Sequence, residues 1–309
     1  MKSLLKITAL FTLLILIKEN VIAQGCSDAG FCTIGNLAQQ QTNDTKKQKF
    51  TLQLPAGIGD EEVFVFSPAI QYDNQVSKKW AVQAKLTANY ANGNLGSAAG
   101  LGDVFLSGTY IFPNKKNDWN LSATIGSKLP LSQANLDSKG RSLPMQYQSS
   151  LGTIDLITGV ALSNKKWQFA AGWQQPLSGI NGNNFLPIYF NNNEAEKYIP
   201  SNDFNRKGDV LLRGLYKYSP GNRLRLNGGL LGIYHLGEDT YIDGNVSNKP
   251  IAIKGSDGLT LNASVAGWYS LSKKITLGLS AALPLVIRDV RPDGLTRSFV
   301  VSPEISWSF

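Results

Sequence analysis

The sequence predicts an all-β protein, namely a closed antiparallel transmembrane β-barrel of about twelve strands, with ten or fourteen strands as alternatives. Three observations lead to this prediction. Apolar and polar residues alternate along many segments, short and long connections alternate between these segments, and aromatic residues gather beside the short connections. A period of two gives a strand one apolar and one polar face. In a barrel of the bacterial outer membrane, the apolar face meets lipid and the polar face meets the lumen.

The alternating pattern recurs in about twelve segments beyond residue 47, and single-chain outer-membrane barrels use an even number of strands. In the clearest segment, WAVQAKLTANY (80–90), every second residue from Trp80 to Tyr90 is apolar and most of the others are polar. The segments run approximately over 48–58, 61–73, 79–90, 101–112, 118–130, 147–163, 166–177, 207–219, 222–236, 258–271, 274–288 and 296–309.

The first two segments are the least regular. They could form a hairpin, or one irregular strand and a plug, which leaves ten strands as an alternative. Pro68, Pro284 and Pro303 stand inside proposed strands, where each removes one donor from the hydrogen-bond ladder. At Pro303 we expect a local bulge or irregularity.

The connections alternate in length along the chain. Short polar ones read DNQVSKK, PNKKND, SNKK, SPGN and SKK, whereas the intervening ones are mostly longer, as at 91–100, 131–146, 178–206 and 237–257. Outer-membrane barrels have short periplasmic turns and longer external loops. We therefore expect the short turns at the periplasmic end, and we expect the glycine-rich stretch NGNLGSAAGLGD to be a flexible external loop.

Aromatic residues mark the strand ends beside the short turns. Three tryptophans each open a segment after such a turn, and the tail VSPEISWSF (301–309) ends on two further aromatic residues. Because amphipathic rings settle at the level of the lipid headgroups, we predict an interfacial girdle of Trp80, Trp119, Trp167, Tyr216, Trp307 and Phe309. The tail would be the last strand, through which the outer-membrane insertion machinery would engage the chain.

The first 23 residues have the features of a secretory signal peptide. A basic start precedes an apolar run over 7–17, which is too short to span a bilayer, and Ala23 ends a cleavage site of small residues. Residues 24–47 would then form an N-terminal periplasmic segment. In an oxidising compartment, its Cys26 and Cys32 predict a disulfide that closes a small loop, with lipidation of Cys26 as the alternative.

The charge and hydropathy of the chain exclude two classes of protein. The net charge is +8, or about +6 without the charged residues of the signal region, and it is spread along the chain. Dispersed charge on an exported chain argues against a nucleic-acid partner. Beyond the signal region, no stretch approaches the roughly 20 apolar residues of a transmembrane helix, so we expect strands to make the contact with the lipid bilayer.

Ten charged residues have the parity of the polar face and are predicted to line the lumen: Lys85, Asp103, Lys128, Asp155, Asp209, Arg213, Lys217, Arg225, Arg288 and Glu304. They could simply pair and make the interior rigid. Alternatively, they could form a polar passage whose slight cationic excess favours anionic or amphipathic solutes, because rings of charge set the selectivity of a pore. A twelve-stranded barrel is narrow enough for side chains to occlude it.

Residues that could support catalysis or metal binding are scarce. His235 is the only histidine, and its parity predicts a pore-lining or loop residue near the external mouth. The chain offers it no neighbouring serine as a nucleophile. Glu238, Asp239, Asp243 and Asn245 could hold a calcium ion, but their spacing favours a solvated acidic turn. We therefore predict no catalytic residue, no metal and no cofactor.

Two stretches, GLGDVFLSGTYIF (100–112) and GSKLPLS (126–132), resemble the pattern of a bacterial outer-membrane family of transporters named for the meta-pathway of phenol degradation. In that family, which is similar to the long-chain fatty-acid channels, Gly-x-Gly-Asp opens a strand and Lys-Leu-Pro closes the next one. The stretch KGDVLLRGLYKY (207–218) echoes the first motif. The start GCSDAGFCTIG resembles secreted proteins of the Bacteroidetes and departs from the fatty-acid channels, which carry a larger plug. The resemblance implies transport of hydrophobic substrates.

Together, these observations predict a porin-like channel in the outer membrane of a Gram-negative bacterium. It would take up small hydrophobic, aromatic or anionic solutes passively, with no enzyme activity. A non-conducting structural or adhesive surface barrel is the alternative, with binding in the loop 178–206, whose Phe185, Tyr189 and Phe190 would be exposed. An outer-membrane enzyme is less favoured, because the sequence shows no cluster of titratable residues.

Overall fold

The structure, a computed structural model, describes one part of the chain with three short gaps, namely residues 48–309 except 114–117, 179–180 and 295–296. The expected signal peptide (1–23) and the expected periplasmic segment (24–47), with Cys26 and Cys32, lie outside the described residues. Within the described residues, no helix is long and apolar enough to cross a membrane.

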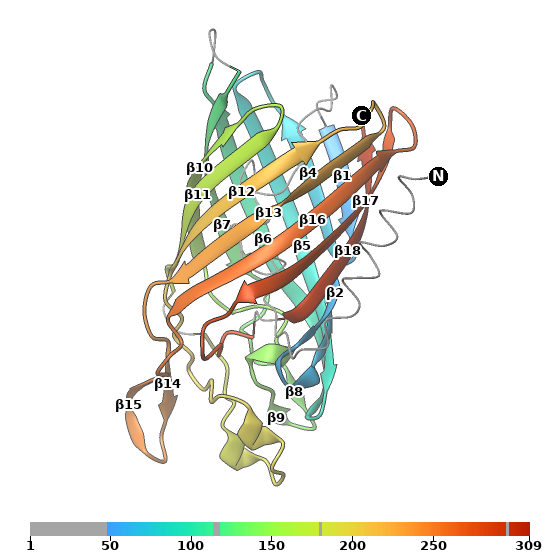
Figure 1. Ribbon diagram of the computed structural model, residues 1–309. Helices are drawn as coiled ribbons and strands as arrows, with labels where there is room; N and C mark the ends of the chain where they lie inside the picture. Colours follow the sequence, from blue (N-terminus) through green and yellow to red (C-terminus); the bar gives the residue numbers. More distant parts are fainter. Residues whose placement is uncertain (1–47, 114–117, 179–180, 295–296) are drawn as a thin grey trace.

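Fourteen strands form one large antiparallel sheet (Figure 1). They are β1 (Gln48–Gln53), β2 (Ala56–Gly59), β3 (Phe64–Phe66), β4 (Ala69–Gln75), β5 (Trp80–Gly93), β6 (Gly96–Ile111), β7 (Asn120–Pro130), β10 (Asp155–Ser163), β11 (Trp167–Pro176), β12 (Asp209–Tyr218), β13 (Leu224–His235), β16 (Gly258–Ser270), β17 (Ile275–Val286) and β18 (Arg297–Ser308). The sheet closes because β1 pairs with β4 on one side and with β18 on the other.

The wall of the barrel has twelve strands, because β1 and β2 form one interrupted strand and β3 and β4 form another. The predicted closed barrel of twelve antiparallel strands is thereby confirmed. The two irregular segments at the start are a hairpin, and the alternatives of ten and fourteen strands were wrong.

The two ends of the barrel differ in their connections. The short turns after β4, β10, β12 and β16 lie at the end where the chain terminates, which we call the turn end (Figure 1). The longer connections lie at the opposite end, which we call the loop end. They carry η3 (Asp60–Glu62), β8 (Asp137–Ser138), β9 (Arg141–Ser142), η4 (Met145–Tyr147), η5 (Pro187–Tyr189), η6 (Ala195–Lys197), β14 (Thr240–Asp243) and β15 (Ser247–Ala252).

One expected loop is a pair of strands. β5 and β6 continue through 91–100 as the longest hairpin of the barrel, and Gly93 pairs with Gly96 across a two-residue turn. The small residues are needed for packing, since a Cβ atom at Gly93 would collide with the hydroxyl of Tyr147. The glycine-rich stretch thus allows the close approach of another segment, and the prediction of a flexible loop was wrong.

Prolines interrupt the first hairpin without changing its register. Pro55 separates β1 from β2, and Pro68 separates β3 from β4, while the pairing of these strands keeps the same register on both sides. A proline has no N–H to donate. Both prolines therefore act only as acceptors, Pro55 from the amide of Ser67 and Pro68 from the amide of Ala88, each at 2.9 Å.

Pro303 and Pro284 behave differently from each other. β18 keeps its register with β17 through Pro303, whose carbonyl accepts the amide of Leu54 at 2.9 Å. The expected bulge at Pro303 is absent, and the irregularity lies in the neighbouring strand, where β1 ends before Pro55. At Pro284 the pairing of β16 with β17 does shift by one residue, next to Asn262.

Burial alternates along the strands. In β7, Leu121 and Ile125 are 42 % and 60 % exposed, whereas Ser122 and Thr124 are 4 % exposed. The buried side of a strand in a single closed layer faces the interior, so the apolar exposed side of the wall faces outward. The inner face carries polar residues and one apolar cluster, which consists of Phe105, Ile157, Ala161, Ala170, Leu211, Leu231 and Ile233. An apolar outer surface around a closed barrel is the arrangement that a bilayer requires, because no backbone group is left unpaired in hydrocarbon.

Candidate functional site

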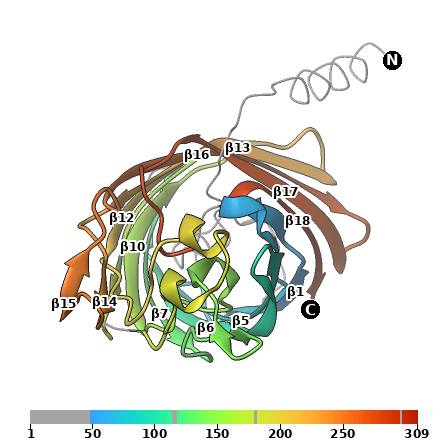
Figure 2. The same cartoon turned by 90° about the horizontal axis from the view of Figure 1, so that it is seen from below.

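Two connections at the loop end fold over the mouth of the barrel. They are residues 131–154 and the described residues of 177–208, drawn in green and yellow across the opening in Figure 2, and we call them the cap. Asn183 joins them, since its buried amide nitrogen donates to the carbonyl of Ala134 at 2.7 Å and to that of Leu143 at 3.0 Å. Its side-chain oxygen accepts the hydroxyl of Ser201 at 2.8 Å. The cap is therefore an ordered unit of folded loops.

An apolar cluster holds the cap against the long β5–β6 hairpin. Tyr147, Phe185 and Tyr198 are almost completely buried there, together with Leu95 of the hairpin turn. Tyr147 also accepts the amide of Leu95 through its hydroxyl, at 3.1 Å. The predicted exposure of Phe185 was wrong, because this ring fills the centre of the cap.

The other two aromatic residues predicted for the surface lie at the edge of the cap. Tyr189 is 55 % exposed, while Phe190 is half-buried against Phe185 and lies under the guanidinium of Arg141. The aromatic residues of 178–206 thus mainly build the cap, and only a minority of them reach solvent.

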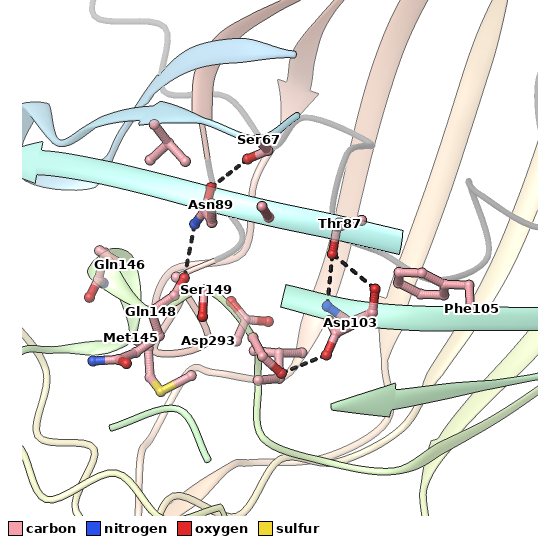
Figure 3. A pocket seen from close by; sticks show the side chains of 15 residues that line it. Ser67, Thr87, Asn89, Asp103, Phe105, Met145, Gln146, Gln148, Ser149 and Asp293 are labelled. Carbon is pink, nitrogen blue, oxygen red and sulfur yellow. Dashed lines mark hydrogen bonds between the residues drawn. The ribbon is translucent and has the colours of Figure 1, made fainter. Parts of the chain in front are cut away.

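Polar contacts join the cap to the inner wall around a small cavity. Figure 3 shows Asn89 between Ser67 and the backbone of Gln148, and Thr87 beside Asp103, whose carboxylate accepts the hydroxyl of Ser150. The cavity has a volume of about 40 Å³. That volume holds a few water molecules, whereas sites for small molecules usually measure roughly 300–1,000 Å³. This cavity is therefore too small to hold a solute molecule.

His235 lies buried at the end of β13 between two carboxylates. Its Nδ1 is 2.7 Å from Oδ1 of Asp209, which begins β12, and its Nε2 is 2.8 Å from Oδ1 of Asp239 in the connection 236–257. Asp239 also accepts the amide of Lys207 at 2.8 Å. The histidine thus links two strands of the wall to an external connection.

Two arginines extend this cluster to the last connection of the barrel. Arg206 of the cap bonds Asp209 at 2.6 Å and Asp293 at 3.3 Å, and Arg288 also bonds Asp293. Burial would raise the pKa of Asp293, but Arg288 and Arg206 hold this pKa well below its usual range. We call the six residues the mouth network: Arg206, Asp209, His235, Asp239, Arg288 and Asp293.

A second ion pair at the loop end lies beside the mouth network. Arg291 bonds Asp60 of η3 at 2.9 Å. Burial raises the pKa of Asp60 to about 6, although the Arg291 guanidinium opposes the rise. This carboxyl group therefore titrates closer to neutrality than an ordinary aspartate.

The structure separates the ten residues predicted for the lumen into several groups. Lys128 and Asp155 form a fully buried ion pair of 3.0 Å. Asp209 and Arg288 belong to the mouth network, and Glu304 accepts the indole N–H of Trp268 at 2.6 Å. Lys85, Asp103 and Arg213 are also buried, whereas Lys217, Arg225 and Glu304 are partly exposed.

Sequence reasoning missed half of the mouth network. Arg206, Asp239 and Asp293 come from connections, where period-two parity does not apply, and Asp239 was assigned to a solvated turn although it is fully buried. The spacing of His235 and Asp239, four residues apart across a strand end, was the available signal. The expectation that no titratable cluster exists was therefore wrong. No cluster that could hold a metal ion occurs among the described residues.

Aromatic residues at the turn end contact one another on the outer surface. Trp80 meets Tyr110 and Trp167 meets Tyr216, each pair with ring centroids 5.0 Å apart. Further contacts join Phe50 to Trp307 at 6.2 Å and Trp119 to Phe169 at 6.1 Å, and Phe309 is 66 % exposed. The predicted residues thus lie at one end of the barrel, on strands spread around its wall.

No protein-family model matches the chain, and no curated protein matches it. Among solved structures, the COG4313 outer membrane channel from Pseudomonas putida F1 is similar over 88 % of this chain and 100 % of that chain, with a TM-score of 0.59 and 13 % identity. The match to the NanC porin covers 84 % of this chain and 98 % of that chain, with a TM-score of 0.47 and 11 % identity. The match to the KdgM porin covers 84 % of this chain and 99 % of that chain, with a TM-score of 0.44 and 6 % identity.

At 13 % identity, the likeness to the COG4313 channel shows a shared fold. That fold is the closed antiparallel barrel of bacterial outer-membrane proteins, and the apolar outer surface fits it. The chain is therefore a barrel of the bacterial outer membrane that contacts the lipid bilayer through its strands.

Proposed function

We propose that this barrel is a passive outer-membrane channel for small hydrophobic, aromatic or anionic solutes. One observation carries the proposal: polar and charged side chains line much of the inner face of a closed barrel. The fold shared with outer-membrane channels supports this reading, as does the sequence resemblance to the meta-pathway transporters. Passive diffusion needs no cofactor and no catalytic residue.

The charges on the inner face support a preference for anions. Lys85, Arg213, Lys217 and Arg225 all have inward parity between the mouth network and the turn end, where Glu304 is an inward acid. A cationic excess along a pore attracts anions and carboxylate-bearing aromatic solutes. We therefore propose that these residues line the solute path.

Single-channel recording on refolded protein in a planar bilayer tests the proposal. We expect discrete conductance steps and, in a salt gradient, a reversal potential on the anion-selective side. The double variant Lys217→Gln/Arg225→Gln should reduce the anion selectivity by about twofold or more. Lys249→Gln, on the exposed strand β15, is the matched control and should change nothing. Silence at every voltage and every pH, with the barrel folded, would remove the channel.

The second candidate is a non-conducting surface barrel. The small volume of the cavity favours it, as do three exposed apolar side chains at the loop end, Ile188 at 68 %, Tyr189 at 55 % and Val246 at 76 %. Such a protein would remain silent in the bilayer and would bind a cell surface through these side chains.

Two further proposals concern the membrane. We propose that the aromatic residues at the turn end lie at the periplasmic headgroup level, where amphipathic rings settle. We also propose that the insertion machinery engages β18, because its outward residues end on Trp307 and Phe309. The insertion machinery should speed the assembly of the wild type into lipid. It should speed the assembly of the variant with alanine at both positions much less.

A further inference from the structure

The geometry of the mouth network requires a charged histidine. Both ring nitrogens of His235 are within hydrogen-bond distance of a carboxylate oxygen, at 2.7 Å from Asp209 and 2.8 Å from Asp239. A neutral imidazole carries one N–H donor, whereas an imidazolium carries two. With both carboxylates ionised, both contacts are hydrogen bonds only when the ring is protonated on both nitrogens.

The charges of the network lead to the same conclusion. Its three carboxylates, Asp209, Asp239 and Asp293, face Arg206, Arg288 and His235. Among the described side chains, these six charges cancel only if the histidine is positive. The neighbouring charged groups are two ion pairs, Lys128 with Asp155 and Arg291 with Asp60, and the carboxylate of Asp103, which lines the same cavity as Asp293 and accepts the hydroxyl of Ser150. A neutral histidine would leave a buried excess of one negative charge, which is costly.

The network lies where the cap, the wall and the last connection meet. Arg206 belongs to the cap, Asp209 and His235 to the wall, Asp239 to the connection 236–257, and Asp293 to the connection after β17. Arg288 also donates to the carbonyl of Ser256 at 2.7 Å. Gly294, which follows Asp293, packs so closely on the backbone of Met145 in η4 that no side chain fits between them. A change at the network thus acts directly on the segments that close the mouth.

We propose that the mouth network is a pH-dependent gate: protonated His235 holds the cap closed, and loss of its proton to solvent opens the mouth. This inference rests on the proposed channel function. Without this proton, His235 can donate to only one of the two carboxylates, Asp209 or Asp239. The second carboxylate then has no donor from the ring, although it still lies beside the first. The side-chain oxygen Oδ2 of Asp239 is already buried without a partner among the described residues, and Oδ1 would keep only the amide of Lys207. Asp209 and Asp239 then repel each other, and the connection 236–257 moves away from the wall.

Because the chain contains a single histidine, its protonation can be read directly. Protein labelled with ¹⁵N-histidine gives the two nitrogen signals of a single imidazole, which would report the charged ring at neutral pH and its loss of a proton as the pH is raised. Single-channel recordings over the same range should show an open probability that rises about tenfold or more, since loss of a buried charge-assisted hydrogen bond is worth that factor. The two transitions should coincide.

Variants separate the network from general effects of pH. His235→Gln and Asp239→Asn should give channels that are open at all pH values. Asp243→Asn, the same change on the same connection but outside the network, should keep the wild-type pH dependence. Circular dichroism would establish that each barrel is folded. A ring that is neutral at neutral pH, or an open probability that ignores its titration, would overturn the gate.

A separate measurement tells failure of the gate from failure of the channel. Limited proteolysis at Lys197, an exposed residue of η6, reports the release of the cap without any current. If the protein is silent at every pH while cleavage rises with the titration of His235, the channel function fails and the pH-dependent release of the cap stands. If neither current nor cleavage follows the titration, the gate itself is wrong.

Discussion

The turn end and the loop end of the barrel bury their charges to different degrees. At the turn end, Lys49 and Asp73 form a loose ion pair of 3.5 Å with each side chain 20 % exposed. Towards the loop end, Lys128 and Asp155 form a pair of 3.0 Å with no exposure at all. The backbone connections differ in the same way, with short turns at one end and a folded cap at the other. The wall repeats the same strand pattern along the barrel, whereas the folded connections and the fully buried ion pair lie towards the mouth.

The largest effect is expected from breaking the buried pair. Asp155→Asn leaves Lys128 as a buried charge without its ionic partner, and we expect a loss of about 3–5 kcal/mol in the free energy of unfolding. Asp73→Asn at the turn end is the matched change and should cost less than about 1 kcal/mol. Urea unfolding of the barrels in lipid vesicles measures both. Equal losses at the two ends would contradict the comparison.

An intermediate effect is expected where the cap packs on the wall. Gly93→Ala places a methyl group against the hydroxyl of Tyr147 and should destabilise the protein by about 1–3 kcal/mol. The double variant Gly93→Ala/Tyr147→Phe removes the colliding oxygen and should recover part of this loss. Gly108→Ala is the control, because a Cβ atom there has open space around it. Urea unfolding is again the measurement, and a loss that is unchanged in the double variant would contradict the contact.

The smallest effect concerns the pH dependence of η3. The pKa of Asp60 is raised to about 6, so the folded protein holds this proton more tightly than the unfolded chain does. The contribution of Asp60 to stability is therefore full below about pH 4 and is lost as the pH rises through about 6. Asp60→Asn should remove this slope. The measurement is the difference in unfolding free energy between wild type and variant across that range, and a constant difference would refute the shift.

The wall could be predicted from the sequence because each strand repeats one local rule. The outward residues of 80–90 and 301–309 follow a period of two, and the tertiary structure adds nothing that changes it. The prediction for 91–100 was wrong because glycines suggest a flexible loop, whereas Gly93 allows the close approach of Tyr147. Composition does not report which segment will pack against a glycine.

The mouth network could be predicted only in part. Asp209 and Arg288 were found from their parity, since they lie in or next to strands. Arg206 and Asp293 lie in connections and are 87 residues apart in the chain, so their contact depends on how the cap folds. Such long-range contacts between irregular segments have no periodic signature, which is why His235 could be placed near the mouth but not among its partners.

The seam between β1 and β18 has a consequence for biogenesis. Thr51 and Ser306 hydrogen-bond across it at 2.9 Å, although 255 residues separate them. During synthesis and export, the outer edge of the first hairpin has no partner until the last twelve residues have arrived. An unpaired edge invites aggregation. The barrel can therefore close only after β18 has been made, so its first hairpin keeps an open edge for longer than any other part of the wall.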